Sequence, residues 1–171
     1  MASLSADTAA VLIASAIKAR QKAYAPYSGF SVGAAVMTKE GEIFTGCNVE
    51  NASYSATMCA ERTAIFSAVA QGCREFAAIA VTGGRSGGDP EDFCFPCGMC
   101  LQVMSEFCSP SFEIYIVKSP DEVRRFRLRD LLPVKFEKDA QNASSSGTCL
   151  YPLSGNCSKY DSLAGSDGQE E

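Results

Sequence analysis

Two cysteine motifs, Cys59-Ala60-Glu61-Arg62 and Pro96-Cys97-Gly98-Met99-Cys100, constrain the fold of this chain more than any other feature, because they must meet in space to share one metal ion. The chain contains no histidine. Histidine-containing zinc sites, Ser-His-Asp triads and Cys-His nucleophile pairs are therefore excluded. A structural zinc is usually closed by four protein ligands, whereas a hydrolytic zinc has three and keeps its fourth position for water. The motifs therefore favour a catalytic zinc site built from thiolates.

Composition indicates one domain and argues against polyanionic partners. The chain has 171 residues, of which 46% are hydrophobic, which is enough apolar material for a single core. Its formal net charge of −5 and its pI of about 4.8 disfavour nucleic acid or an anionic membrane as the main partner, because both need concentrated positive charge. We therefore expect a small neutral or cationic substrate.

The sequence carries no recognisable signal for export or membrane insertion. No N-terminal run has the charged, apolar and cleavage regions of a signal peptide, and no stretch of about 18 apolar residues could span a bilayer. The nine cysteines are odd in number, so reduced thiols and a metal explain them better than a disulfide framework. We expect a cytoplasmic protein.

Hydrophobic periodicity predicts alternating helices and strands. The expected helices span residues 8–22, 59–70 and 96–108, and the expected strands span residues 30–37, 42–49, 76–81 and 112–117. The first two strands flank Lys39-Glu40-Gly41 as a hairpin would. The glycine-rich run 83–90 lacks the lysine and the serine or threonine that close a phosphate-binding loop, so we expect a surface loop there.

Near the C-terminus the pattern changes twice. Arg125, Arg127 and Arg129 alternate with apolar residues, which predicts a half-buried strand with a cationic outer face. Beyond residue 138 the composition shifts to Ser, Gly, Asn and Asp, with too few apolar residues to order the backbone by burial. We expect a folded domain over residues 1–138 and a disordered tail over residues 139–171, with Cys149 and Cys157 as free thiols.

The spacing within the two motifs suits metal binding and hydrolysis. Cys97 and Cys100 lie three residues apart at a predicted helix start, so their sulfurs share one face, and the helix dipole favours thiolates there and at Cys59. Cys-x-x-Cys alone fits a redox pair or a structural knuckle equally well. Glu61 lies two residues after Cys59, so it is directed away from the metal and can act as a general acid and base.

Charge compensation is the expected role of Arg62. Zinc with three thiolates carries a net charge of −1, which weakens water activation relative to a site that contains histidine. The Arg62 guanidinium can offset this charge by donating hydrogen bonds to the sulfurs. An ordinary solvated helix arginine remains the alternative.

Taken together, the motifs resemble the homotetrameric, three-cysteine class of cytidine deaminases over roughly residues 8–137. The matching segments are Tyr27-Ser28-Gly29-Phe30-Ser31-Val32-Gly33-Ala34-Ala35, Asn48-Val49-Glu50-Asn51-Ala52-Ser53-Tyr54, Cys59-Ala60-Glu61-Arg62-Thr63-Ala64 and Pro96-Cys97-Gly98-Met99-Cys100. The resemblance implies an α/β fold, a three-layer α/β/α sandwich with a five-stranded mixed sheet. It implies zinc (Zn2+) on Cys59, Cys97 and Cys100, with Glu61 as the catalytic proton shuttle.

The implied activity is hydrolytic deamination of cytidine and deoxycytidine to uridine and deoxyuridine, by attack of zinc-activated water on C4. The substrate-binding residues implied by the resemblance are Asn48 and Glu50 for the ribose hydroxyls, Phe30 for the base, Ala60 through its backbone, and Phe136 from a neighbouring subunit. Asn48 and Glu50 alternate on an expected strand, so both can face the same hydroxyls. The partners implied are a nucleoside and three further copies of the chain.

Two alternatives remain, together with one departure from the family pattern. Leu101 stands where the family usually has arginine, so a further cation or an interface contact is in doubt. A deaminase of another aminopyrimidine nucleoside would use the same metal chemistry. A non-catalytic zinc or iron-sulfur module would result if Cys94 closed a four-thiolate site with the other three cysteines.

Overall fold

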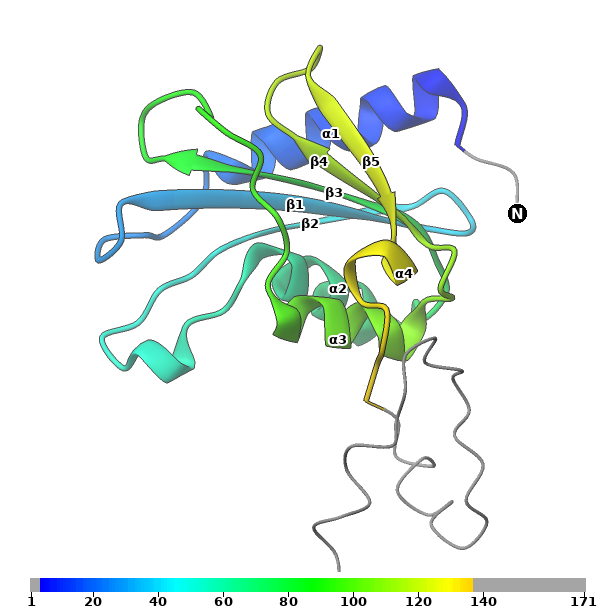
Figure 1. Ribbon diagram of the computed structural model, residues 1–171. Coiled ribbons are helices and arrows are strands. Elements are labelled where there is room, and N and C mark those ends of the chain that lie inside the picture. Colours follow the sequence, from blue (N-terminus) through cyan, green and yellow to red (C-terminus); the bar gives the residue numbers. More distant parts are fainter. Residues whose placement is uncertain (1–3, 137–171) are drawn as a thin grey trace, which may run out of the picture. The chain divides into compact units, whose positions relative to one another are not determined.

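A five-stranded mixed sheet organises the computed structural model, which describes residues 4–136 (Figure 1). The strand order is β2-β1-β3-β4-β5. The strands are β1 (Phe30–Thr38), β2 (Ile43–Cys47), β3 (Phe76–Arg85), β4 (Glu113–Val117) and β5 (Val123–Arg127). β3 and β4 run parallel, and every other neighbouring pair is antiparallel. The mixed five-stranded architecture expected from the sequence is confirmed.

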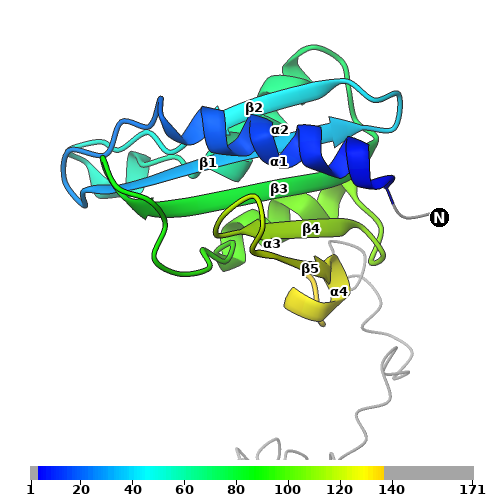
Figure 2. The same cartoon turned by 90° about the horizontal axis from the view of Figure 1, so that it is seen from above.

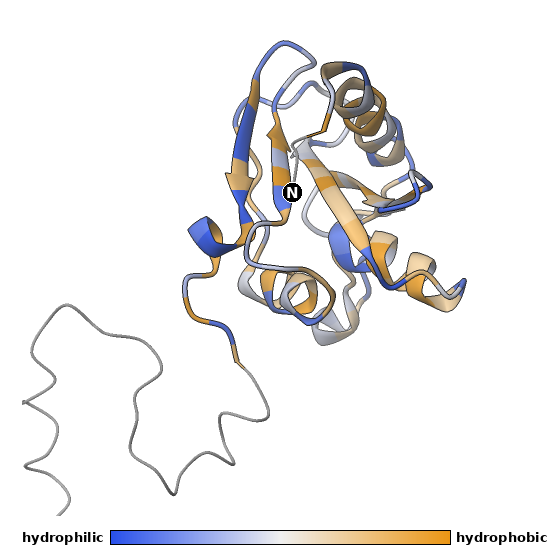
Figure 3. Cartoon of the chain, turned by 90° about the vertical axis from the view of Figure 1, so that its right-hand side faces the viewer, coloured by the Kyte–Doolittle hydropathy of each residue, from blue (hydrophilic) through white to orange (hydrophobic). Residues whose placement is uncertain are grey.

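Helices cover both faces of this sheet, as Figures 1 and 2 show. The helices are α1 (Ala6–Arg20), α2 (Ala60–Ala70), α3 (Gly98–Phe107) and α4 (Leu128–Leu131), with a 3-10 turn at Tyr54–Ala56. The helix α1 lies on one face, whereas α2 and α3 lie on the other. Figure 3 shows hydrophobic residues concentrated along the central strands. One apolar cluster joins α1 to the sheet and a second joins α2 and α3 to it.

The helix α1 begins where its sequence provides a cap. Ser5 Oγ accepts a hydrogen bond from the backbone N–H of Thr8 at 3.2 Å, which satisfies one of the unpaired amides of the first turn. Leu12 and Ala16 are fully buried against the sheet. The helix therefore starts two residues before the expected position, because the cap is Ser5, and it ends at Arg20.

Two glycines allow helices to approach the sheet closely. A Cβ atom at Gly33 would lie 2.3 Å from the carbonyl oxygen of Ala16 in α1, and one at Gly46 would lie 2.4 Å from that of Ala60 in α2. Such distances are far shorter than any real carbon–oxygen contact, so only glycine permits this packing. The position of α2 relative to β2 therefore depends on Gly46.

The strand β3 is longer than expected and corrects the prediction of a loop over residues 83–90. Gly83 and Gly84 belong to β3 and pair with β1, where they face Val32 and Ser31. A Cβ atom at Gly83 would lie 2.7 Å from Cys94 Sγ, and one at Gly84 would lie 2.8 Å from Pro90 Cα. The absence of a side chain at these glycines therefore lets the segment with Pro90 and Cys94 pack against β3. Only the residues after Arg85 leave the sheet.

Arg129 was expected on a strand and lies in α4 instead. The strand β5 ends at Arg127, whose backbone N–H donates to Asp130 Oδ2 at 2.7 Å and so begins the helix. Asp130 thus overrides the alternation of arginines that predicted a longer strand. Within residues 4–136, no helix combines the length and the apolar character that crossing a membrane requires.

Contacts divide the chain into two units, Met1–Lys135 and Phe136–Glu171. All the elements above belong to the first unit. The predicted boundary after residue 138, the predicted tail and its two cysteines lie outside the described residues, so these remain predictions.

Candidate metal centre and neighbouring site

Three cysteine sulfurs converge at the starts of two helices. Cys59 is the N-cap residue of α2, and Cys97 is the N-cap residue of α3. Cys100 lies one turn further along α3 and is fully buried, whereas Cys97 is exposed. All three sulfurs lie within 4.8 Å of one another. The two motifs therefore meet as the sequence predicted.

The spacing of these sulfurs fits a tetrahedral zinc ion. Zinc–sulfur bonds of about 2.3 Å at tetrahedral angles place two sulfurs about 3.8 Å apart. The distance from Cys97 Sγ is 3.9 Å to Cys59 Sγ and 3.5 Å to Cys100 Sγ. Three thiols with this spacing, one of them open to the surface, can hold zinc and leave one coordination position for water.

Cys94 does not belong to this cluster. Among the residues that the structure describes, the group able to hold a metal contains Cys59, Cys97 and Cys100 only. Cys94 instead packs against β3 at Gly83. Burial, followed by the nearby charges of Glu61 and Cys59, raises the pKa of Cys94 to about 11, which keeps it a thiol. The geometry therefore does not support a four-thiolate structural site.

The electrostatics of the cluster favour an anionic sulfur on Cys59. A hydrogen bond from the Cys100 thiol, helped by Arg62, lowers the pKa of Cys59 to about 5. The same contact with Cys59, together with burial, raises the pKa of Cys100. The Cys59 thiolate thus forms readily, and its negative charge disfavours deprotonation of Cys100. A bound cation would offset the repulsion between neighbouring thiolates, because it stabilises every thiolate that contacts it.

Arg62 lies against the cluster as the sequence predicted. Its Nη2 donates to Cys59 Sγ at 3.3 Å and to the carbonyl oxygen of Thr57 at 3.5 Å. Leu101 is 7% exposed and packs in the core, so the residue that departs from the family pattern supplies no charge here. The geometry favours charge compensation over the alternative of a solvated arginine.

We expect Arg62→Gln to weaken zinc affinity by about 10- to 100-fold, which is the usual effect of removing a hydrogen bond to a metal ligand. Competition with a chromophoric chelator would measure this affinity. Arg62→Lys should recover part of the loss because it retains the charge, and Arg74→Gln, at an exposed position, should have no effect. Unchanged zinc affinity in Arg62→Gln would refute charge compensation.

Glu61 is a buried carboxyl beside the thiols. It is only 4% exposed and lies in the first turn of α2. Burial, followed by the negative charge of Cys59, raises the pKa of Glu61 above its ordinary value. It is absent from the metal-binding group. The carboxyl is therefore placed beside the ligands without being one of them, and its raised pKa suits a group that both accepts and donates protons.

Asn48 bonds the start of β1 and Glu50 bonds the turn before it, and neither residue lies in a strand, which corrects the expectation that they share one. The strand β2 ends at Cys47, so neither residue belongs to it. Asn48 Nδ2 donates to the Phe30 carbonyl at 2.8 Å, and Asn48 Oδ1 accepts from the Val32 N–H at 2.8 Å. The Asn48 side chain thereby fixes the first residues of β1, on either side of Ser31.

Glu50 binds the turn that precedes β1. Its Oε2 accepts from the backbone N–H groups of Tyr27 and Ser28 at 2.8 and 3.2 Å, and its Oε1 accepts from Ser28 Oγ. The Ser28 hydroxyl, with these two amides, lowers the pKa of Glu50. Sequence reasoning gave Ser28 no separate role. The turn-forming run Pro26-Tyr27-Ser28-Gly29, with Gly29 at φ 63°, was the available signal.

A cavity of about 600 Å³ lies between the start of β1, the end of β3 and the segment that leads to α3. Its lining includes Ser28, Phe30, Gly83, Phe93 and Cys94. Glu61 and the three clustered cysteines are not among its lining residues, but Cys94 is, and the charges of Glu61 and Cys59 help to raise the pKa of Cys94. Phe30 is 40% exposed at the start of β1.

The other two predicted substrate-binding residues differ in exposure. Ala60 is fully buried as the first residue of α2, so it can offer only backbone groups. Phe136, in the second unit, is 64% exposed.

Comparisons with known proteins agree with this geometry. Residues 7–116 match the family model for the cytidine and deoxycytidylate deaminase zinc-binding region. The cytidine deaminase of Sporosarcina psychrophila is 46% identical over 75% of this chain and 90% of its own length, and that of Halalkalibacterium halodurans is 42% identical over 77% and 96%. The crystal structure of cytidine deaminase from Burkholderia pseudomallei is 49% identical and has a TM-score of 0.69, covering 78% of this chain and all of its own.

Proposed function

This chain belongs to the cytidine and deoxycytidylate deaminase family, and from that premise we propose that it converts cytidine and deoxycytidine to uridine and deoxyuridine by zinc-dependent hydrolysis. One observation carries the proposal: three sulfurs spaced for a single zinc lie beside a buried carboxyl that is not a ligand. Hydrolysis needs both parts, because the metal activates water and a separate group must move the protons.

Cys59, Cys97 and Cys100 hold the zinc ion in this proposal. When bound, zinc lowers the pKa of water so that it becomes a nucleophile near neutral pH. Arg62 donates to Cys59 and reduces the negative charge that three thiolates impose on the site. Cys97 is the exposed member of the three.

Glu61 moves protons between water, base and leaving group. Its carboxylate takes a proton from the attacking water and delivers it to N3 of the pyrimidine, so that C4 becomes tetrahedral. It then takes the second proton from the new C4 hydroxyl and delivers it to the amino group, which leaves as ammonia. One carboxyl serves every step because its burial keeps it from exchanging these protons with solvent.

The substrate lies against Phe30, with its ribose near Asn48 and Glu50. The Asn48 amide is 8% exposed and makes two backbone hydrogen bonds, which leave one amide hydrogen and one oxygen lone pair for a hydroxyl. Glu50 is anchored by Ser28 and retains lone pairs as well. The Ala60 backbone, at the start of α2, accompanies Glu61 in the site.

A substrate panel tests the reaction and its specificity. The zinc-loaded protein should deaminate cytidine and deoxycytidine. The reaction is measured by the change in ultraviolet absorbance when the C4 amino group is lost, and by the release of ammonia. Cytosine lacks the ribose that Asn48 and Glu50 contact, and the monophosphates would bring negative charge beside Glu50, so both should be poor substrates. Turnover of monophosphates alone, or of another aminopyrimidine nucleoside in preference to cytidine, would overturn the substrate assignment.

We also propose that the protein is a homotetramer in which Phe136 reaches the site of a neighbouring subunit. The support is that two aromatic side chains of the described residues are largely exposed, Tyr54 at 74% and Phe136 at 64%. Co-expressed Glu61→Gln and Phe136→Ala subunits should regain activity above either parent, because some hybrid sites combine an intact Glu61 with an intact Phe136. Light scattering should give four times the chain mass, and a fully active monomer would refute the proposal.

A reducing compartment, the cytoplasm, suits this chemistry. In an oxidising compartment, thiols whose sulfurs lie only 3.5 and 3.9 Å apart could form disulfides instead of binding a metal ion.

A further inference from the structure

A second, larger cavity of about 1000 Å³ lies on the α1 face of the sheet. Its walls come from the end of α1, the start of β1, the ends of β3 and β4, the glycine-containing segment 86–90 and the turn between β4 and β5. The carboxyl ends of parallel strands are a preferred place for ligand sites in α/β proteins. We propose that this cavity is a binding site for an uncharged, hydroxyl-rich small molecule, either a pentose or a nucleoside.

Thr82 is the buried polar group that points to a ligand. It is 1% exposed, and its Oγ1 is buried without a hydrogen-bond partner although the residue lines the cavity. An unpaired buried hydroxyl destabilises the folded state, because it has lost its hydrogen bonds to water without replacing them. In β3, Ala78 and Ala80 pack in the α1-face cluster, and Thr82 continues that alternation. A ligand hydroxyl in the cavity would give Thr82 its missing partner.

Arg20 fixes another part of the cavity wall and directs its donors at protein carbonyls there. Its Nε donates to the Ser31 carbonyl at 3.0 Å, and its Nη2 donates to the carbonyls of Arg85 and Gly88 at 2.7 and 2.8 Å. These bonds tie α1 to β1 and to the segment after β3. The wall is therefore preformed, and the Arg20 charge is directed at protein carbonyls.

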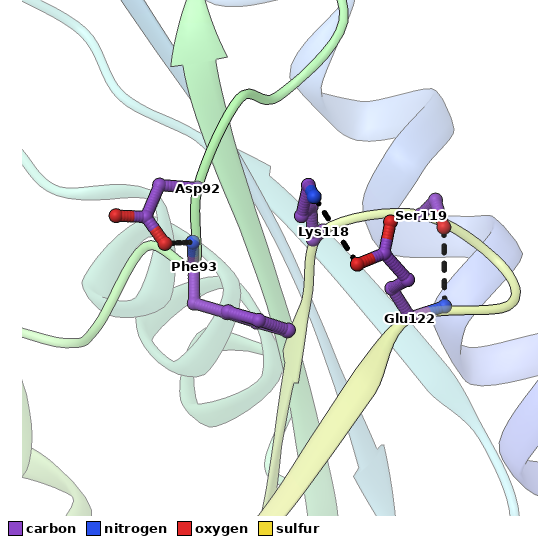
Figure 4. Close-up of polar contacts among 5 residues, drawn as sticks. All are labelled: Asp92, Phe93, Lys118, Ser119 and Glu122. Atoms are coloured by element: carbon purple, nitrogen blue, oxygen red, sulfur yellow. Dashed lines mark hydrogen bonds and ion pairs between the residues drawn. The ribbon is translucent and has the colours of Figure 1, made fainter.

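The turn between β4 and β5 forms another wall, and the two charged residues that it contributes to the lining are paired with each other. Lys118 Nζ and Glu122 Oε2 form an ion pair at 3.1 Å, and the Glu122 N–H donates to Ser119 Oγ at 3.1 Å, as Figure 4 shows. With Arg20 committed to carbonyls and Lys118 paired, the lining lacks the concentrated positive charge that a phosphate requires. This balance favours an uncharged ligand.

Hydroxyl groups supply the remaining recognition. Ser31 Oγ and Ser86 Oγ are hydrogen-bonded to each other at 2.7 Å, so one of the two hydroxyl protons is left to donate onward. Ile17 and Pro90 add apolar surface. Hydroxyls beside small apolar patches match the alternating polar and apolar faces of a pentose.

This cavity is separate from the metal centre. Ile79 and Val81 of β3 pack in the cluster that contains Cys100 and α2, whereas Ala80 packs in the α1 cluster on the other face. The sheet thus lies between the two sites, and a ligand on the α1 face has no access to Glu61. Ligand binding in this cavity can therefore be measured without an assay of enzymatic activity.

Isoleucine methyl NMR on the full-length, zinc-loaded protein tests the proposal. Ile17 lines the cavity, and Ile65, fully buried in α2, reports on the metal side. Ribose, uridine and orthophosphate are titrated separately. We expect ribose or uridine to shift the Ile17 methyl saturably. If ribose alone shifts this methyl, the cavity is a pentose site. If only uridine shifts it, the cavity is a nucleoside site.

Thr82→Val removes the hydroxyl and retains the side-chain shape. The affinity measured from the Ile17 methyl shift should fall by about tenfold, which corresponds to the loss of one hydrogen bond. Any shift of the Ile65 methyl caused by uridine should persist. Thr45→Val, at an exposed position of β2, is the matched control and should bind as the unmodified chain does. No saturable Ile17 shift with either sugar compound, a stronger response to orthophosphate, or equal binding in Thr82→Val would overturn the proposal.

Discussion

Replacing Glu61 with glutamine is expected to lower kcat by roughly 10³-fold, within the range that general acid–base catalysis contributes. Glutamine keeps the size and one carbonyl oxygen, but it cannot take a proton from water or deliver one to N3. Because Glu61 is absent from the group that can hold the metal, zinc content should stay near that of the unmodified protein. KM should change little, since the binding residues are untouched.

Steady-state kinetics with cytidine and zinc determination by mass spectrometry would measure both effects. Glu106→Gln is the matched control, because Glu106 is an exposed residue of α3, and its kcat should be unchanged. Retained activity in Glu61→Gln would remove Glu61 from the mechanism. Loss of zinc together with activity would instead assign Glu61 a structural role at the metal.

The parts of the fold that could be predicted from sequence are those governed by local pattern. Helix α2 ends before Gly72, which adopts φ 92° as a helix stop does, and α3 starts immediately after Pro96-Cys97. The β1–β2 hairpin follows from apolar runs around a turn. Local chemistry also placed the ligands, because Cys-x-x-Cys at a helix start leaves few arrangements for its sulfurs.

What could not be predicted depends on contacts between distant segments. Gly83 and Gly84 resemble loop residues in sequence, yet they extend β3 because Cys94 and Pro90 pack against them. Gly46 carries no local signal that α2 will cross β2 at that residue. A glycine required by close approach looks the same in a sequence as one required by a turn.

The same limit applies to substrate binding. Alternation along a strand was the reason for grouping Asn48 with Glu50, and the structure does not support that reason, because β2 ends before both. Each instead bonds a different part of the chain around the start of β1, Asn48 at Phe30 in the strand and Glu50 at Ser28 before it. Their position relative to Phe30 is thus set by hydrogen bonds that no periodicity encodes. Substitution of either residue should therefore disturb base binding as well as ribose binding.

Cys100→Ala is expected to abolish zinc retention and, with it, activity. Cys100 is fully buried between the other two thiols and Glu61, so its loss leaves two ligands, one of them exposed. Two thiolates and a buried carboxyl cannot reproduce a three-sulfur site, and zinc affinity should fall by several orders of magnitude. Because bound zinc stabilises the folded state, the unfolding temperature of the variant should also no longer rise when zinc is added.

Cys108→Ala separates the loss of a ligand from the loss of a buried thiol. Cys108 is 8% exposed at the C-cap of the same helix, and burial raises its pKa to about 12, so it is a packing thiol. This control should lose some stability through a small cavity yet keep its zinc and its kcat. Zinc determination and calorimetry with and without added zinc would compare the two variants. If Cys100→Ala retained one zinc per chain, or if Cys108→Ala lost it equally, the ion would have to lie elsewhere, and the hydrolytic site built on α2 and α3 would be wrong.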